Sequence, residues 1–450
     1  MAVVIPRPRL KFTDNRQQRR RFVPLLGLAL LISLSLGASF LAAAANGAEG
    51  DAGCASRPAP PFLVQSVESW EPLNKLFRVK RGWVGADGAY SIPVAPGRSI
   101  WTFGDTWIGV IENGRREKPC MVNNTVAVQS WSVANSAGAE TGSSGSGNGG
   151  IYFYWPGGME HPGSMWVPDN AKQSKTYYWP ADGAFVGGRL FVFLHKIRTN
   201  LKLPEPFQFE SAGDDLVVVE NPLEAPERWR QKKQVVSTDS KTFHQATACL
   251  LDGDYLYIYS NYIPARRDLN PHPLIVSRIK KADMEVMEPD LSCVEYFLED
   301  GSWSRVLASA GNEKNQNIFK DAKKPKILFM DGAPEMSVCR VRGLPGYFAV
   351  YMPPLTRRIA MRWAEKPEGP WSEPLTLYNC PEKDDSILQY SAKSHQELLS
   401  DDAADGELIV TYCRNTKTME EHFSKPEIYF PQALKIRLDF QGSQGNSASK

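Results

Sequence analysis

The stretch GWVGADGAYSIPVAPGRSIWTFGDTW, residues 82–107, has the pattern of a β-hairpin. From Asp87 onward apolar and polar residues alternate, Pro96 lies in a Gly-containing turn, and residues 100–103 would form the returning strand. Asp87 and Asp105 each lie nine residues from Pro96, so a nearly symmetric register places both carboxylates at one rim of the sheet. Two acids at one rim can form a general acid/base pair, although a single Asp-Gly is more often only a turn.

The composition indicates a mostly β chain. Its 450 residues, which include 33 Pro, 35 Gly, 12 Trp, 16 Tyr and 20 Phe, suffice for one large domain or two ordinary ones. Short aromatic and β-branched runs between turn residues are common, and long helical patterns with caps are hard to find. The seven cysteines are far apart and form no zinc motif, which leaves their pairing undetermined.

Residues 1–48 have the features of an export signal. Three arginines at 19–21 precede an apolar run over about residues 22–45 that ends in small residues. A membrane anchor is the alternative, because this run is just long enough to span a bilayer. We expect an exported protein that is periplasmic, on the cell surface or extracellular. Without residues 1–48 the chain has 45 Lys and Arg against 49 Asp and Glu, which gives no support for nucleic-acid binding.

The rest of the chain is expected to form one domain over residues 62–440. Residues 49–61 would be a Pro-rich leader, and residues 441–450 a disordered tail. Residues 134–150 are small and polar, and we expect a loop insert there because strand-like sequence resumes at once. We expect the protein to be a monomer.

A repeated unit runs through this domain: a polar residue that opens a strand, a Gly-rich turn and an apolar returning strand. The five openers are Asp87, Asp182, His244, Glu335 and His395, with gaps of 95, 62, 91 and 60 residues. Five all-strand units predict an all-β fold, a five-bladed β-propeller, because a β-sandwich would not give a periodic polar opener. The innermost strands of a propeller run in one direction around a channel, so the openers would converge at one mouth.

Several motifs of the chain resemble the bacterial propeller families labelled domains of unknown function 4185 and 5005. These motifs are Asp87-Gly88-Ala89-Tyr90-Ser91, Gly104-Asp105-Thr106, Trp179-Pro180-Ala181-Asp182-Gly183, Pro334-Glu335-Met336-Ser337 and His395-Gln396-Glu397. The resemblance spans roughly residues 83–415. It implies a propeller and a glycoside hydrolase, since some relatives belong to family 183 and act on D-arabinan, with families 43 and 32 as distant analogues. Gln396 stands where a proline is expected, and the insert at 134–150 is an addition.

The expected function is an exported glycoside hydrolase that cleaves a polysaccharide, an arabinan-like furanoside or a related glycan. Cleavage needs a carboxylic acid to protonate the leaving oxygen and a carboxylate as base or nucleophile. The first and fourth units lie nearly opposite each other across a five-bladed channel, so we expect Asp87 as the base and Glu335 as the acid. Asp105 and Asp182 would orient the site, tune its pKa values or bind sugar hydroxyls.

Aromatic faces stack on sugar rings and polar groups bind sugar hydroxyls, which suggests a set of substrate contacts. These candidates are Trp107, Asn124, Trp179, His244, His395 and Glu397. We expect no cofactor and no metal ligands. A Ca²⁺ ion in the channel stays an alternative, although no contiguous acidic loop argues for one.

The competing function is a non-catalytic carbohydrate-binding propeller, a lectin or adhesin, because propellers host many functions. The carboxylates discriminate between the two, since a binder needs no opposed pair of acids.

Overall fold

The computed structural model describes residues 57–132, 149–203, 208–238, 243–262, 272–305, 324–382, 384 and 386–441. The expected export signal, most of the leader, residues 134–148 of the insert and the tail from residue 442 lie outside the described residues. The described chain is mostly β, as predicted, and its strands begin at Phe62 and end at Phe440.

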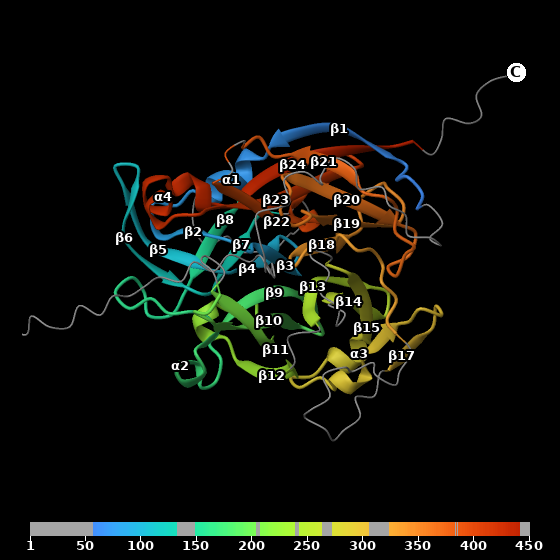
Figure 1. Cartoon of the computed structure of the whole chain (residues 1–450), viewed down its shortest axis with the longest axis horizontal. Coiled ribbons are helices and arrows are strands. Elements are labelled where there is room, and N and C mark those ends of the chain that lie inside the picture. Colours follow the sequence, from blue (N-terminus) through green and yellow to red (C-terminus); the bar gives the residue numbers. More distant parts are fainter. Residues whose placement is uncertain are drawn as a thin grey trace, which may run out of the picture.

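Among the residues that the structure describes, five antiparallel sheets have four or five strands each. Figure 1 shows their arrangement. The first contains β3 (Tyr90–Ala95), β4 (Arg98–Phe103), β7 (Thr125–Ser130) and β8 (Gly150–Tyr154). The second contains β9 (Thr176–Val186), β10 (Arg189–Thr199), β11 (Phe209–Val219) and β12 (Gln231–Ser237). The third contains β13 (Phe243–Asp252), β14 (Tyr255–Tyr262), β15 (Leu274–Lys280), β16 (Glu295–Phe297) and β17 (Trp303–Arg305).

The fourth and fifth sheets complete this set. The fourth contains β18 (Met336–Cys339), β19 (Tyr347–Tyr351), β20 (Arg358–Ala364) and β21 (Leu375–Asn379). The fifth contains β22 (Ile387–Ser394), β23 (Glu407–Thr416), β24 (Gln432–Phe440) and β1 (Phe62–Ser69). The first described strand therefore pairs with the last, with Phe62 opposite Phe440.

Each sheet packs against two neighbours through alternate side chains. In β10, Val192 lies in a core cluster with Ile100 of the first sheet, whereas Phe191 lies in a cluster with Ile258 of the third. Three further clusters join the third sheet to the fourth, the fourth to the fifth and the fifth to the first. The strands β3, β9, β13, β18 and β22 lie around the middle of the view (Figure 1). In this order, β3 contacts β9, β9 contacts β13, β13 contacts β18 and β18 contacts β22.

A sixth, three-stranded sheet consists of β2 (Arg81–Ala86), β5 (Thr106–Glu112) and β6 (Arg115–Val122). We call it the small sheet. The sequence predicts one hairpin over residues 82–107, and this prediction is wrong for the two ends of the stretch. The central part, β3 and β4, forms the predicted hairpin with Tyr90 opposite Thr102, but the two flanks leave it to pair in the small sheet. Positive φ angles at Gly88 and Ala89 separate β2 from β3.

In the described residues, helical structure is limited to short segments between strands. The α-helices are α1 (Glu71–Phe77), α2 (Ala171–Ser174), α3 (Lys281–Met284) and α4 (Met419–Ser424). The 3₁₀ segments are η1 (Pro226–Arg228), η2 (Leu291–Cys293), η3 (Gln396–Leu398) and η4 (Pro426–Tyr429). None of the helices in the described part of the chain is long and apolar enough to span a membrane.

Three of the five predicted openers lie at the start of an innermost strand, and two do not. Asp87 and Glu335 lie just before β3 and β18, and His244 is the second residue of β13. Asp182 lies in the middle of β9 instead. His395 follows the end of β22, so its prediction as an opener is wrong. The reason is that η3, and not a tight turn, connects β22 to β23.

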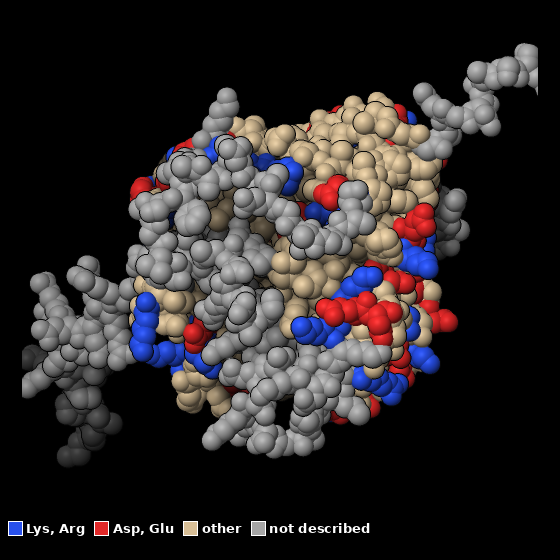
Figure 2. Space-filling model, turned by 45° about the vertical axis from the view of Figure 1, so that its right-hand side comes forward, with Lys and Arg blue, Asp and Glu red and all other residues tan. Residues whose placement is uncertain are grey.

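Charges of both signs lie next to one another on the face shown in Figure 2, in the lower right part of the view. Surface ion pairs of the protein include Lys232 Nζ with Glu288 Oε2 at 2.6 Å and Arg230 Nε with Glu220 Oε2 at 2.7 Å. Exposed pairs of this kind contribute little to stability.

Six of the seven cysteines lie among the described residues, and all six are free thiols. Cys249, Cys339 and Cys413 lie in β13, β18 and β23.

Candidate active site

Three carboxyl groups predicted from the sequence lie together near the ends of β3, β4 and β18. Asp87, Asp105 and Glu335 are 3%, 1% and 8% exposed. Glycines allow the backbone to approach them: a Cβ on Gly104 would lie 2.4 Å from Asp87 Oδ1, and one on Gly88 would lie 3.7 Å from Glu335 Oε1. Burial, followed by the charges of Asp105 and Glu335, raises the pKa of Asp87 well above its usual range.

Two hydroxyl groups hold one oxygen of Asp87. Tyr390 in β22 and Tyr429 in η4 donate to Asp87 Oδ2 over 2.7 and 2.9 Å. Neither tyrosine was singled out in the sequence. Tyr390 lies upstream of the opener assumed for the fifth unit, and Tyr429 comes from a segment outside the predicted repeat.

Side-chain N–H groups hold Asp105. Its Oδ1 accepts hydrogen bonds from Asn123 Nδ2 at 3.0 Å and from Trp179 Nε1 at 3.1 Å. Trp179, predicted as a sugar contact, is therefore brought to the carboxyl group, where it orients Asp105. Hydrogen bonds from N–H groups favour an ionised carboxylate.

A buried lysine, Lys393 of β22, lies beside Glu335. Its Nζ is 3.6 Å from Glu335 Oε1 and 4.1 Å from the centroid of the Tyr90 ring, and the lysine is 1% exposed. It also donates to the hydroxyl and carbonyl oxygens of Ser391. Within the described residues Glu335 Oε2 has no hydrogen-bond partner. Lys393 was not predicted as a site residue, because the sequence repeat places the start of the fifth inner strand at His395, after this lysine.

Asp182 lies in the middle of β9, at a bulge of this strand. The register of β9 against β10 shifts between Val192 and Leu194, opposite Asp182. The carboxylate accepts from the backbone N–H groups of Gly183 at 2.8 Å and Cys249 at 2.7 Å. Burial raises the pKa of Asp182 to about 7, and these two hydrogen bonds oppose that rise. Asp182 thus titrates near neutral pH.

His395 and Glu397 lie farther along, beyond the end of β22. The two ring nitrogens of His395 are hydrogen-bonded to Ser91 Oγ at 2.6 Å and Thr411 Oγ1 at 2.7 Å, and burial lowers its pKa to about 3. Glu397 accepts from the Ser91 hydroxyl, and burial raises its pKa to about 7. The structure therefore does not bring these two residues into the group around Asp87.

A cavity with a volume of about 930 Å³ also lies on the Glu397 side. Trp70, Trp131 and Lys435 are among its lining residues, and none of Asp87, Asp105, Asp182 and Glu335 lines it. The carboxyl groups and this cavity are separate features.

Two other predicted contacts have packing roles. Trp107 is buried against Val84 and Tyr429, and its indole N–H donates to His422 over 3.3 Å. Asn124 is fully buried, and its side-chain amide bonds the backbone at Trp166 and Tyr178. Because these hydrogen bonds occupy the Asn124 amide, it holds the chain between sheets rather than reaching a ligand.

His244 is buried next to His195, with ring centroids 5.7 Å apart. Neither of its ring nitrogens has a hydrogen-bond partner within the described residues, and burial lowers its pKa well below the usual range. His195 itself is paired with Asp214 at 2.7 Å. In the part of the chain that the structure describes, no group of three or more His, Cys, Asp or Glu residues is arranged to hold a metal ion.

The family model described as Domain of unknown function (DUF5005) matches residues 71–437. The chain belongs to the DUF5005 family. This match confirms the resemblance noted in the sequence and covers Asp87, Asp105, Asp182 and Glu335. No curated protein has a sequence that matches this DUF5005 protein.

Solved structures similar to this DUF5005 protein include a candidate hydrolase from Bacteroides ovatus, with 16% identity, a TM-score of 0.58, and coverage of 85% of this chain and 93% of that one. A GH43_1 enzyme from Xanthomonas citri, complexed with xylose, is 13% identical with a TM-score of 0.41, covering 85% and 97%. A family 117 glycoside hydrolase from Zobellia galactanivorans is 6% identical with a TM-score of 0.36, covering 86% and 92%. The likeness to the first of these shows a shared fold.

Proposed function

We propose that this DUF5005 protein is an exported glycoside hydrolase that cleaves a polysaccharide with Asp87 and Glu335. The observation that carries the proposal is the burial of three carboxyl groups, Asp87, Asp105 and Glu335, of which the latter two lie close enough to raise the pKa of Asp87. Burial of like charges is costly, and such clusters are typical of sites that perform acid/base chemistry. A purely structural role would be served equally well by apolar side chains.

We infer further that the five larger sheets are blades of a five-bladed β-propeller. Five core clusters, each between two successive sheets and the last between the fifth and the first, support this arrangement. The starts of β3 and β18 then face each other across the channel. Asp87 and Glu335 precede these two strands, which is the placement a glycosidase needs for groups on either side of a glycosidic bond.

The charges around the pair suggest which member holds the proton. Burial, followed by the carboxyl groups of Asp105 and Glu335, raises the pKa of Asp87 well above its usual range, which makes Asp87 the member suited to carry the proton. We therefore assign proton donation to the leaving oxygen to Asp87, and the role of base or nucleophile to Glu335. This assignment reverses the roles expected from the sequence.

Asp182 and Trp179 would complete the site. Asp182, whose pKa is raised to about 7 by burial, lies within electrostatic range of Lys393 and shares this cation with Glu335. Trp179 fixes the orientation of Asp105 through its indole N–H. For the substrate we propose an arabinan-like furanoside or a related glycan, on the strength of the family resemblance.

Hydrolysis is the direct test. The mature chain without residues 1–48 would be incubated with arabinans and with other furanose and pyranose polymers, and release of reducing ends would be measured. Cleavage of at least one polymer by wild type, lost in Asp87→Asn and Glu335→Gln, is the expected result. Binding of a polymer without cleavage would instead identify a carbohydrate-binding protein and overturn the proposal.

A further inference from the structure

We propose that Tyr390 and Tyr429 are positioning residues: their hydroxyl groups hydrogen-bond Oδ2 of Asp87 and leave Oδ1 for proton transfer. The small sheet and η4 hold Tyr429 in the position that this role requires. The inference rests on the proposed function, because it concerns the same carboxyl group. It adds to the site Tyr390, Tyr429 and the small sheet with η4, none of which was predicted to have this role.

The two hydroxyl groups converge on one atom from different parts of the chain. Tyr390 Oη and Tyr429 Oη lie 2.7 and 2.9 Å from Asp87 Oδ2, and Tyr429 Oη also lies 3.2 Å from the backbone oxygen of Asp105. Asn415 Nδ2 lies 3.4 Å from Tyr390 Oη. A carboxyl group held through one oxygen cannot rotate without losing both hydrogen bonds, so the direction of Oδ1 is fixed.

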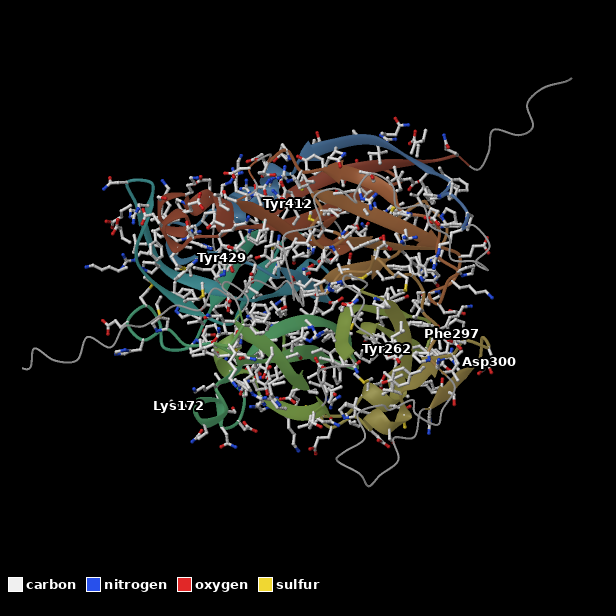
Figure 3. The ribbon with its side chains drawn as sticks, viewed as in Figure 1. Lys172, Tyr262, Phe297, Asp300, Tyr412 and Tyr429 are labelled. Carbon is white, nitrogen blue, oxygen red and sulfur yellow. The ribbon has the colours of Figure 1, made fainter. Side chains whose placement is uncertain are left out.

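The position of Tyr429 depends on the small sheet as well as on the fifth sheet, because η4 contacts both β2 and β23. Figure 3 shows Tyr429 on the side of the molecule where α4 and the small sheet lie. Its ring packs with Val84 of β2 and Trp107 of β5. A Cβ on Gly85 would lie 2.6 Å from the backbone oxygen of Tyr429, so β2 and η4 are in direct contact.

Arg116 of β6 stabilises the contact between β2 and η4 through hydrogen bonds. It is 1% exposed, and it donates to the carbonyl oxygens of Val84 and Pro426, both at 2.7 Å, and to that of His422. One buried guanidinium group thus ties β2, α4 and η4 together. Since a guanidinium group can donate in several directions at once and an ammonium group lacks its planar geometry, lysine is a poor substitute here.

The hydroxyl groups also have a chemical consequence that packing alone would not have. Hydrogen bonds donated to a carboxylate stabilise its ionised form, and the two tyrosines thereby partly offset the rise in the pKa of Asp87 that burial causes. Removal of either hydroxyl should therefore raise the pKa of Asp87 further. The pH limb that moves identifies the role of Asp87: the alkaline limb if it is the acid, and the acidic limb if it is the base.

The experiment compares pH profiles of kcat/KM for wild type, Tyr390→Phe, Tyr429→Phe and Tyr259→Phe. Tyr259 is the matched control, because its buried hydroxyl donates to a backbone oxygen, that of Pro367 at 2.8 Å, and not to a carboxylate. We expect one limb to move to higher pH by about one pH unit in each of the first two variants. The Tyr259→Phe profile should keep both limbs. Unmoved limbs in Tyr390→Phe and Tyr429→Phe would overturn the proposal.

The support for Tyr429 is tested by a double-mutant cycle. Arg116→Lys should move the same limb in the wild-type background and add nothing in the Tyr429→Phe background, because both changes act through one hydroxyl. Additive movement would show that Arg116 does not act through Tyr429. If Arg116→Lys does not fold, Gly85→Ala takes its place in the cycle.

A second readout does not depend on activity. The melting temperature is measured against pH for each protein and for the same protein with Asp87→Asn, and the difference reports the titration of Asp87. Absence of hydrolysis by wild type would overturn the proposed function, while this difference would still show whether the hydroxyl groups control Asp87. Identical titration of Asp87 in wild type and both Phe variants would overturn the positioning roles.

Discussion

Replacement of Glu335 by glutamine is the change that tests the proposed chemistry most directly. Glutamine preserves the shape and an acceptor oxygen for Lys393, whose Nζ lies 3.6 Å from Glu335 Oε1, but it can neither accept a proton nor attack a sugar. General acid/base catalysis is typically worth about 10²–10⁴-fold, or about 3–5 kcal/mol of activation free energy. We expect a fall in kcat of this size.

The structure also limits the effect on stability. Glu335 Oε2 has no hydrogen-bond partner among the described residues, so the amide replaces no existing bond at that atom. Lys393 keeps its bonds to Ser391 and lies within electrostatic range of Asp182. We therefore expect the free energy of unfolding to fall by less than the roughly 3–5 kcal/mol that follows removal of one partner from a buried ion pair.

Glu407→Gln is the matched control. Glu407 is 9% exposed against 8% for Glu335, forms an ion pair with Lys435 at 2.9 Å, and likewise has an Oε2 without a partner in the described chain. Both variants would be assayed below their melting temperatures on the best polymer and on an aryl glycoside with a good leaving group. Glu335→Gln should be impaired on both substrates and Glu407→Gln on neither.

Two outcomes would refute the reasoning. Near wild-type activity of Glu335→Gln on the polymer would remove Glu335 from the catalytic pair. If Glu335→Gln were impaired on the polymer but active on the aryl glycoside, Glu335 would be the general acid, because a good leaving group needs no proton. The electrostatic assignment of the proton to Asp87 would then be wrong.

Further predictions concern the neighbouring groups and the N-terminus. Asp87→Asn should lose about 10²–10⁴-fold on the polymer but much less on the aryl glycoside; equal losses on both would argue against its role as acid. Burial raises the pKa of Asp182 to about 7, so the contribution of this group to stability is greatest below the ordinary pKa of an aspartate and is lost as pH rises toward 7. The melting temperature of wild type should therefore fall relative to that of Asp182→Asn between about pH 4 and 7. A constant difference between the two melting temperatures would contradict this prediction. Trp179→Phe removes the N–H donor to Asp105. It should lower kcat while changing the melting temperature little, as measured in parallel by reaction rate and by thermal unfolding. Cell fractionation should find the mature protein outside the cytoplasm, and a full-length soluble cytosolic form would contradict the export signal at residues 1–48.

The sequence by itself determined the strand content, the β3–β4 hairpin and three of the carboxyl groups that lie together. Local pattern suffices for these, because alternation of side chains and Gly-containing turns act over a few residues. Asp87, Asp105 and Glu335 each adjoin a strand or turn that such a pattern marks. The same reasoning failed at His395, since a polar residue followed by a later glycine looks alike whether it begins a strand or ends one.

Tertiary structure alone decided which groups surround the carboxyl groups and hence their charge. The two tyrosines, Tyr390 and Tyr429, lie about 300 residues or more from Asp87 in the chain. Lys393 lies 58 residues from Glu335. No short-range sequence pattern connects these residues with the carboxyl groups. Their contacts arise because the fifth sheet and η4 pack against β3 and the small sheet. The pKa of a carboxyl group depends on burial and on the nearest charges, and both are properties of the packed molecule.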